Sequence, residues 1–183
     1  MTKIYLKQYD KAKHEHLLRE WKNDKGSREN CKDNYTTFGL LDIYGDIVEL
    51  LSFYEPVQTE EEFLKSFVAF NDQGKDVGLI VLDHVTFKNG NTALNVFHII
   101  IRPDEQGRGY GSAIMEKVVL AGEKMMGRRV DEVLASVDLR NTASSHMMEK
   151  RGFKIIHETG SYNIYSLDMK ERKQQKEETE IDK

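Results

Sequence analysis

The sequence predicts an α/β domain built on a central mixed, mostly antiparallel sheet of about seven strands flanked by helices. Residues 67–101 hold three apolar runs separated by two tight turns, which predicts an antiparallel meander. From Gly111 the apolar spacing changes to that of an amphipathic helix. Residues 132–169 then hold a strand, a helix and a final strand pair. Strands and helices packed around one core are therefore expected.

The elements before the meander are a strand and two helices. Residues 4–8 alternate apolar and polar side chains, and Asp10 can cap a helix that runs to about Asn23. Residues 38–54 carry the apolar stripe of an amphipathic helix. A capping-box pattern at residues 59–62 predicts one short helical turn before the meander begins.

The remaining elements follow in the order that the apolar spacing sets. They are strands 67–70, 77–85 and 93–101, a helix from Gly111, a strand at 132–137, a helix from Asn141 to Gly152, and strands 153–157 and 162–169. Residues 170–183 are nearly all charged and are predicted to form a solvated, flexible C-terminal tail. Residues 1–169 are therefore expected to form a single domain.

Composition and charge exclude several classes of function. The chain has 27 Lys and Arg against 31 Asp and Glu, so no nucleic-acid partner is expected. No segment approaches the roughly 20 apolar residues of a membrane span, and the first residues do not resemble a leader. Cys31 is the only cysteine, and His14 and His16 cannot share a helix face, so no metal is expected. The sequence thus predicts a cytoplasmic protein without membrane contact.

A glycine-rich loop joins a buried strand to a long helix. The strand ends at residues 99–103, the loop is Gln106 to Gly111, and the helix begins at once. Glycines let successive backbone N–H groups face one anion, and the helix N-terminus adds partial positive charge. A dinucleotide fingerprint would need a glycine at Ser112, and a Walker loop would need Gly-Lys-Ser/Thr. The loop is therefore predicted to bind a pyrophosphate of another kind.

Two segments resemble the motifs of the GNAT superfamily of N-acetyltransferases. IIIRPDEQGRGYGSAIMEKVV, from Ile99, is similar to its central CoA-binding motif, and NTASSHMMEKRGF, from Asn141, is similar to its second motif. The likeness covers roughly residues 60–169 and is nearest in pattern to the RimJ/RimL-type branch. It implies a sheet splayed at the CoA site, acetyl-CoA as co-substrate, and direct acetylation of a primary amine in a ternary complex.

The resemblance also implies which residues hold CoA. The backbone of Ile99 and Ile101 would pair with the pantetheine arm, and Asn141 would contact CoA, although an Asn before a helix is also a common N-cap. The residues that would cradle the pyrophosphate are Gln106, Gly107, Arg108, Gly109, Tyr110, Gly111 and Ser112.

The residues that would move protons are less clearly marked. A lysine-like amine with a pKa of about 10.4 must lose a proton before it attacks, at a cost of roughly 4 to 5 kcal/mol at neutral pH. Asn95 stands where some family members carry a glutamate, so the candidate bases are Glu49 and Asp83. His98 reads as a core residue of an apolar strand.

The second proton belongs to the departing thiolate. Met148 stands where many family members have the tyrosine that protonates this thiolate, so Ser144 or Ser145 is the candidate proton donor. Both serines could equally be ordinary helix residues.

The acceptor is expected to be the amine of a protein N-terminus or of a small molecule. Asp42, Asp46 and Glu49 share one face of the helix at 38–54 and could attract a cationic acceptor such as a polyamine or an aminoglycoside. A solvated helix face explains the same row equally simply. An acyl-CoA-binding module without catalysis is the alternative from another class, and the family resemblance is compatible with a homodimer.

Overall fold

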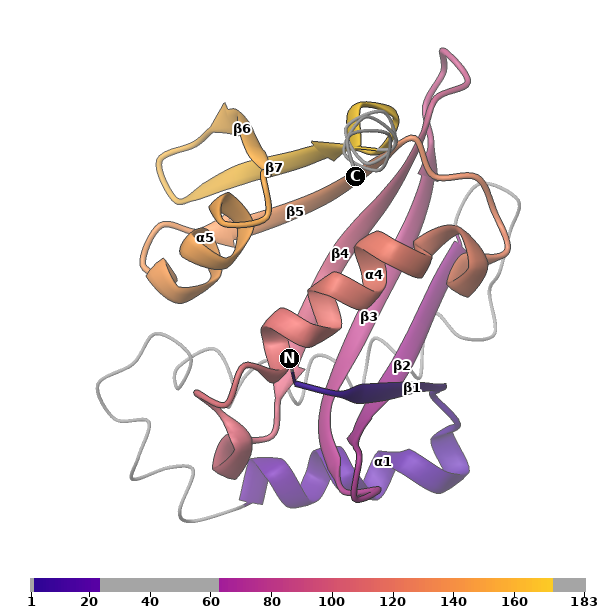
Figure 1. Cartoon of the computed structure of the whole chain (residues 1–183), viewed down its shortest axis with the longest axis vertical. Coiled ribbons are helices and arrows are strands. Elements are labelled where there is room, and N and C mark those ends of the chain that lie inside the picture. The colour runs from indigo at the N-terminus through magenta and orange to yellow at the C-terminus, as the bar shows by residue number, and fades with distance from the viewer. Residues whose placement is uncertain (1, 24–62, 173–183) are drawn as a thin grey trace, which may run out of the picture.

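The computed structural model describes residues 2–23 and 63–172, which contain one seven-stranded sheet with the order β1-β2-β3-β4-β5-β7-β6 (Figure 1). The strands are β1 Ile4–Gln8, β2 Phe63–Asn71, β3 Asp76–Thr86, β4 Thr92–Ile101, β5 Glu132–Asp138, β6 Lys154–Glu158 and β7 Tyr162–Asp168. The helices are α1 Lys11–Asn23, the short 3-10 helix η1 Pro103–Glu105, α4 Tyr110–Met126 and α5 Thr142–Glu149. Neighbouring strands are antiparallel except β4 and β5, which are parallel. The predicted fold class is confirmed.

Helices cover both faces of the sheet. The side chains of Ile114 and Val118 on α4 are fully buried against Leu94 of β4 and its neighbours in the larger core. On the opposite face, Trp21 of α1 packs in a second cluster with Leu79 of β3. Burial of each such large apolar side chain contributes roughly 1.5 to 3 kcal/mol. The sheet is therefore fixed between α4 on one face, called here the α4 face, and α1 on the other, called the α1 face.

The strand β2 begins at Phe63 rather than at the predicted Phe67. Lys65 interrupts the apolar run, but its amine donates hydrogen bonds to the carbonyls of Met125 and Met126, each at 3.2 Å. The aliphatic stem can then lie along the core while the charge is satisfied at the C-terminal end of α4. The predicted helix at 38–54 and the turn at 59–62 lie outside the described residues.

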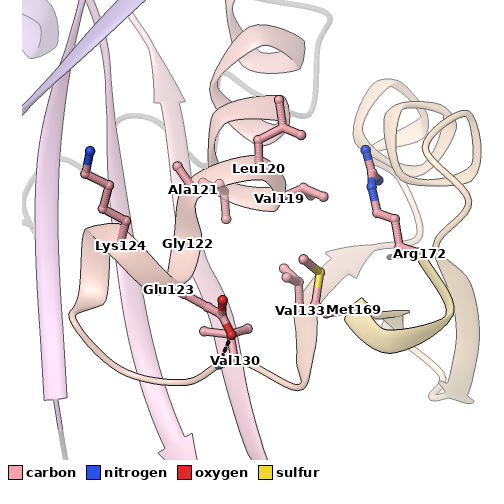
Figure 2. A pocket seen from close by; sticks show the side chains of 11 residues that line it. Val119, Leu120, Ala121, Gly122, Glu123, Lys124, Val130, Val133, Met169 and Arg172 are labelled. Atoms are coloured by element: carbon pink, nitrogen blue, oxygen red, sulfur yellow. Dashed lines mark hydrogen bonds between the residues drawn. The ribbon is translucent and has the colours of Figure 1, made fainter. Parts of the chain in front are cut away.

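The chain continues past β7 as a helical turn at residues 169–172, at the start of the segment predicted as a solvated tail. Arg172 lies 3.6 Å from Glu116 of α4, and Lys170 lies 3.7 Å from Asp131. Figure 2 shows a cavity of about 220 Å³ here, where Val133 and Met169 face the C-terminal half of α4. Its first α4 residue, Val118, is about two helical turns from the glycine loop, so the cavity is separate from it.

The helices within residues 2–23 and 63–172 are all too short or too polar to cross a membrane.

Candidate active site

The glycine loop adopts the conformation that its sequence predicts. Gly107 and Gly109 have φ angles of +74° and +83°, a region that side-chain-bearing residues rarely enter. Gly109 is also the N-cap of α4, and Ala113 donates the first intrahelical bond, to the carbonyl of Gly109 at 3.0 Å. The preceding amides, up to that of Ser112, therefore have no acceptor inside the helix. They form an anion site at a helix N-terminus.

Side chains on the neighbouring elements hold this loop in place. The amide of Gln106 donates to the carbonyl of Ile101 at 3.4 Å, which ties the loop to the end of β4. Arg108 lies 3.2 Å from the carboxylate of Glu105, whose side chain is buried and also accepts a hydrogen bond from Lys75. The hydrogen bond to Glu105 is the main cause of the raised pKa of Lys75, so this pair is ionised at neutral pH.

The sheet opens next to this loop, between β4 and β5. Their parallel ladder runs from Ala93 opposite Glu132 to Val96 opposite Ala135 and then stops, although both strands continue. Figure 1 shows the two strands side by side at one end and diverging toward the other. A cavity of about 330 Å³, called here the splay cavity, lies in this opening. Its lining consists of Val96, Phe97, His98, Ile99, Ala135, Ser136, Val137, Asp138, Asn141, Ser144, Met147 and Met148.

The free edge of β4 presents backbone groups to this opening. The N–H of Arg102 donates to the carbonyl of Val77 in β3 at 2.9 Å. Because successive residues of a strand direct their N–H and C=O groups to opposite sides, those of Ile101 and Ile99 are directed toward the opening. In addition, Phe97 has no partner in the register with β3, since Val81 pairs with His98 and Leu82 with Val96. This β-bulge leaves a backbone amide outside the ladder, beside the cavity.

The helix α5 closes the cavity on the α4 face. Asn141 is its N-cap, and the Asn141 side chain accepts a hydrogen bond from the backbone N–H of Ser144 at 3.2 Å. Arg151, just beyond α5, donates to the carbonyl of Ser112 at 2.6 Å and to that of Met147 at 3.2 Å. Arg151 thus clamps the end of α5 to the first turn of α4.

The sequence profile of the acetyltransferase (GNAT) family matches residues 2–153 of the chain. The chain belongs to this family. No curated protein sequence matches it at a significant level. The predicted transferase activity, acetyl-CoA-dependent N-acetylation, agrees with this membership.

Solved GNAT structures share the fold. One is a spermidine N-acetyltransferase from Vibrio cholerae in complex with CoA and spermine, with 13% identity, a TM-score of 0.61, and coverage of 91% of this chain and 96% of that chain. Another is the N-acetyltransferase PseH of Campylobacter jejuni in complex with acetyl coenzyme A, with 18% identity, a TM-score of 0.56, and coverage of 91% and 99%. At these identities the likeness establishes the common fold.

The GNAT fold separates the predicted catalytic residues in space. Ser144 lines the splay cavity, whereas Ser145, one position further along α5, is not in its lining. Asp83 lies on β3 opposite Asn95, and it too is outside the lining. Glu49 lies outside the described residues.

The structure also brings two histidines to notice. His98, which reads as a core residue in the sequence, is partly exposed and lines the cavity. His84 is buried, and its Nε2 lies 2.8 Å from the carbonyl of Arg129, so it braces the segment after α4. The sequence signal for His98 was only its place in β4, a few residues before the loop.

The described residues fit acetyl-CoA in two respects. The amides at the start of α4 can hold a pyrophosphate, and the opening beside Ile99 and Ile101 can take an extended arm. A further cavity of about 530 Å³ begins at Gly109 and Ser112 and continues between α4 and β1, where space exists for the part of the ligand beyond the pyrophosphate. Within the ranges 2–23 and 63–172, His, Cys, Asp and Glu side chains form no cluster suited to a metal ion.

Proposed function

We propose that this GNAT protein transfers the acetyl group of acetyl-CoA to a primary amine by direct attack in a ternary complex. The observation that carries the proposal is the end of the β4–β5 ladder at Val96 and Ala135, which opens the sheet beside an anion-binding loop. A thioester threaded through this opening from the α4 face would present its carbonyl carbon to an amine on the α1 face. Direct attack then needs no covalent enzyme intermediate.

Each part of the site has a role in this proposal. The loop from Gln106 to Ser112 binds the pyrophosphate, and the backbone of Ile99 and Ile101 pairs with the pantetheine arm, with Asn141 beside it. The amide freed by the bulge at Phe97 can donate to the thioester oxygen as negative charge develops there. Ser144 is the better placed of the two serines to protonate the departing thiolate, because it lines the cavity.

The acceptor is a primary amine of a protein N-terminus or of a small molecule. The second-motif pattern from Asn141 supports kinship with the RimJ/RimL-type branch. A polyamine is supported by the similar fold of the spermidine N-acetyltransferase, and an aminoglycoside needs only a different acceptor pocket. A homodimer also belongs to this proposal, and light scattering coupled to size exclusion would test it.

A non-catalytic acyl-CoA-binding module is the second candidate. It is favoured by Met148, which is buried and lines the cavity where many family members have a tyrosine. Such a module would bind acetyl-CoA as tightly as an enzyme, so that binding alone does not distinguish the two.

The first test is calorimetric titration of acetyl-CoA and CoA into the wild-type protein and Gly109→Trp. The matched control is Gly90→Trp, because Gly90 has a similar φ of +81° but lies in the β3–β4 hairpin. Binding that is lost only in Gly109→Trp supports the cofactor site. Absence of binding to the wild type overturns the proposal.

The second test is thioester turnover with a panel of amines: spermidine, an aminoglycoside, a peptide with a free N-terminus and a simple alkylamine. Acetyl-CoA consumption that depends on one amine class identifies the acceptor. Tight binding without turnover of any amine supports the non-catalytic module instead.

A further inference from the structure

The bulge in β4 changes the direction of two side chains next to the splay cavity. In a regular strand, neighbouring side chains point to opposite faces of the sheet. The rings of Phe97 and His98 are instead in contact, with centroids 4.6 Å apart and planes at 86°. Both side chains therefore lie on the same face, as a β-bulge at Phe97 allows.

That face is the α1 face. His98 lies directly opposite Val81 of β3, which packs with Trp21 in the core under α1. Val96 and Ile99, on either side of the bulge, pack in the core under α4. The imidazole of His98 is thus across the sheet from the glycine loop and α5, and it still lines the opening through which the thioester would pass.

We propose that His98 is the general base that accepts the proton of the attacking amine, an inference that rests on the proposed acetyl transfer. The neutral amine nitrogen donates its lone pair to the thioester carbonyl carbon. The C–N bond forms, the C–S bond breaks, and the electron pair of that bond leaves on the CoA sulfur. The surplus proton on nitrogen passes to the imidazole, and the thiolate takes a proton from Ser144 or from water.

The chemistry of histidine suits this position. The imidazole is the side chain whose unperturbed change of charge falls between about pH 5 and pH 8, so it is available as a base at neutral pH. The titratable groups on the strands beside His98 are Asp83 on β3 and Asp138 on β5, within the part of the chain that the structure describes. Asp138 is engaged by Arg140 in hydrogen bonds of 2.9 Å. Both carboxylates favour the imidazolium that forms.

The geometry selects His98 over the predicted base Asp83. Asp83 pairs with Asn95, which lies before the bulge and within the part of β4 that is still paired to β5. His98 lies after the bulge, where β4 has lost that partner and the sheet is open. A base has to reach the nitrogen at hydrogen-bond distance, and the opening is where the nitrogen meets the thioester.

The test compares His98→Gln with wild type, using kcat/KM over a range of pH and calorimetric titration of acetyl-CoA. Loss of general-base catalysis lowers kcat/KM by about 100- to 10,000-fold at neutral pH. The fall of wild-type kcat/KM toward acidic pH should also be reduced, and acetyl-CoA affinity should stay near wild type. His146→Gln, on the exposed side of α5 and outside the cavity lining, is the matched control and should keep both kcat/KM and its pH profile.

A second variant separates catalysis from structure. Added imidazole should restore part of the activity of His98→Ala, because a free base can enter the space left by the side chain; a role in packing alone would not respond to it. If His98→Gln fails to fold, as judged by thermal unfolding, His98→Ala with imidazole replaces it.

Three results have distinct meanings. Near-wild-type kcat/KM and pH profile in His98→Gln overturn the assignment of His98 and leave acetyl transfer standing. Loss of the acidic limb in Asp83→Asn rather than in His98→Gln also overturns it, in favour of the carboxylate. Failure of the wild type to acetylate any amine overturns the proposed function, and the role of His98 falls with it.

Discussion

Arg151 is predicted to be the side chain that holds α5 and the glycine loop in one geometry. Its guanidinium donates to the carbonyl of Ser112, in the first turn of α4, at 2.6 Å, and to that of Met147 in α5 at 3.2 Å. The side chain is only 14% exposed, and its Nε lies 3.7 Å from Glu116. Replacement by methionine keeps the aliphatic length and removes these donors.

The cost of Arg151→Met follows from these contacts. A hydrogen bond that involves a charged partner contributes about 1.5 to 3 kcal/mol, and the short bond to Ser112 is of this type. The ion pair with Glu116, at 3.7 Å, adds little by comparison. We therefore expect a loss of about 1.5 to 3 kcal/mol in the free energy of unfolding. At roughly 2 to 4 °C per kcal/mol for a chain of this size, the Tm should fall by about 3 to 12 °C.

Urea unfolding and acetyl-CoA titration measure the two consequences. Arg140→Met is the matched control, because Arg140 also pairs with a carboxylate, that of Asp138, but its side chain is 75% exposed. An exposed pair of this kind contributes about 0 to 1 kcal/mol. We also expect weaker acetyl-CoA binding in Arg151→Met only, since α5 carries Asn141 beside the cavity. Equal stability losses in the two variants, or unchanged acetyl-CoA affinity in Arg151→Met, would refute this reasoning.

Three further changes test single contacts. Gly122→Ala places a Cβ 2.7 Å from Cδ2 of Leu94, and we expect a net loss of about 1 to 3 kcal/mol from overpacking, measured by urea unfolding. Asn141→Ala removes the N-cap of α5 and should cost about 1 kcal/mol, whereas Asn141→Asp should keep most of the stability. Desolvation raises the pKa of Asp131, but hydrogen bonds, first that from Arg129, outweigh it and lower the pKa from 3.8 to about 2. Ionised Asp131 therefore stabilises the fold above the unfolded-state value of 3.8, and this is lost as the pH falls toward about 2, so Asp131→Asn should show a shallower loss of stability across that window.

Each of these expectations has a result that contradicts it. A more stable Gly122→Ala would mean that α4 can move away from Leu94 without loss. An unaffected Asn141→Ala would show that α5 is held by packing rather than by its cap. Parallel stability curves of wild type and Asp131→Asn between pH 4 and pH 2, a window set by the lowered pKa, would show that the carboxylate titrates alike in folded and unfolded chains.

Local chemistry explains why much of the fold could be predicted. Gly152 was predicted to end α5 in the left-handed conformation and has a φ of +81°. Asn141 was predicted at the start of that helix and caps it. Such features depend on residues within one turn of each other, so that the sequence pattern carries them directly. The glycine loop is of the same kind, because its conformation follows from Gly107 and Gly109 themselves.

The start of β2 was harder to predict for a reason that lies elsewhere in the chain. Lys65 suits a core-facing strand position only because the carbonyls that end α4 accept its hydrogen bonds from 60 residues away. Periodicity in one segment cannot show a partner at that distance.

The sequence by itself determined the order of strands and helices, the turn chemistry and the anion-binding loop, since these follow from spacing and from residue types that are neighbours along the chain. Tertiary structure alone decided where the sheet opens and which side chains line the opening. The ladder between β4 and β5 ends at Val96, and the register of β4 against β3 places a bulge at Phe97. Register is a relation between strands rather than a property of either one, and a single extra residue redirects a side chain to the other face of the sheet. For that reason His98 is a core residue in the sequence pattern and a cavity residue in the fold.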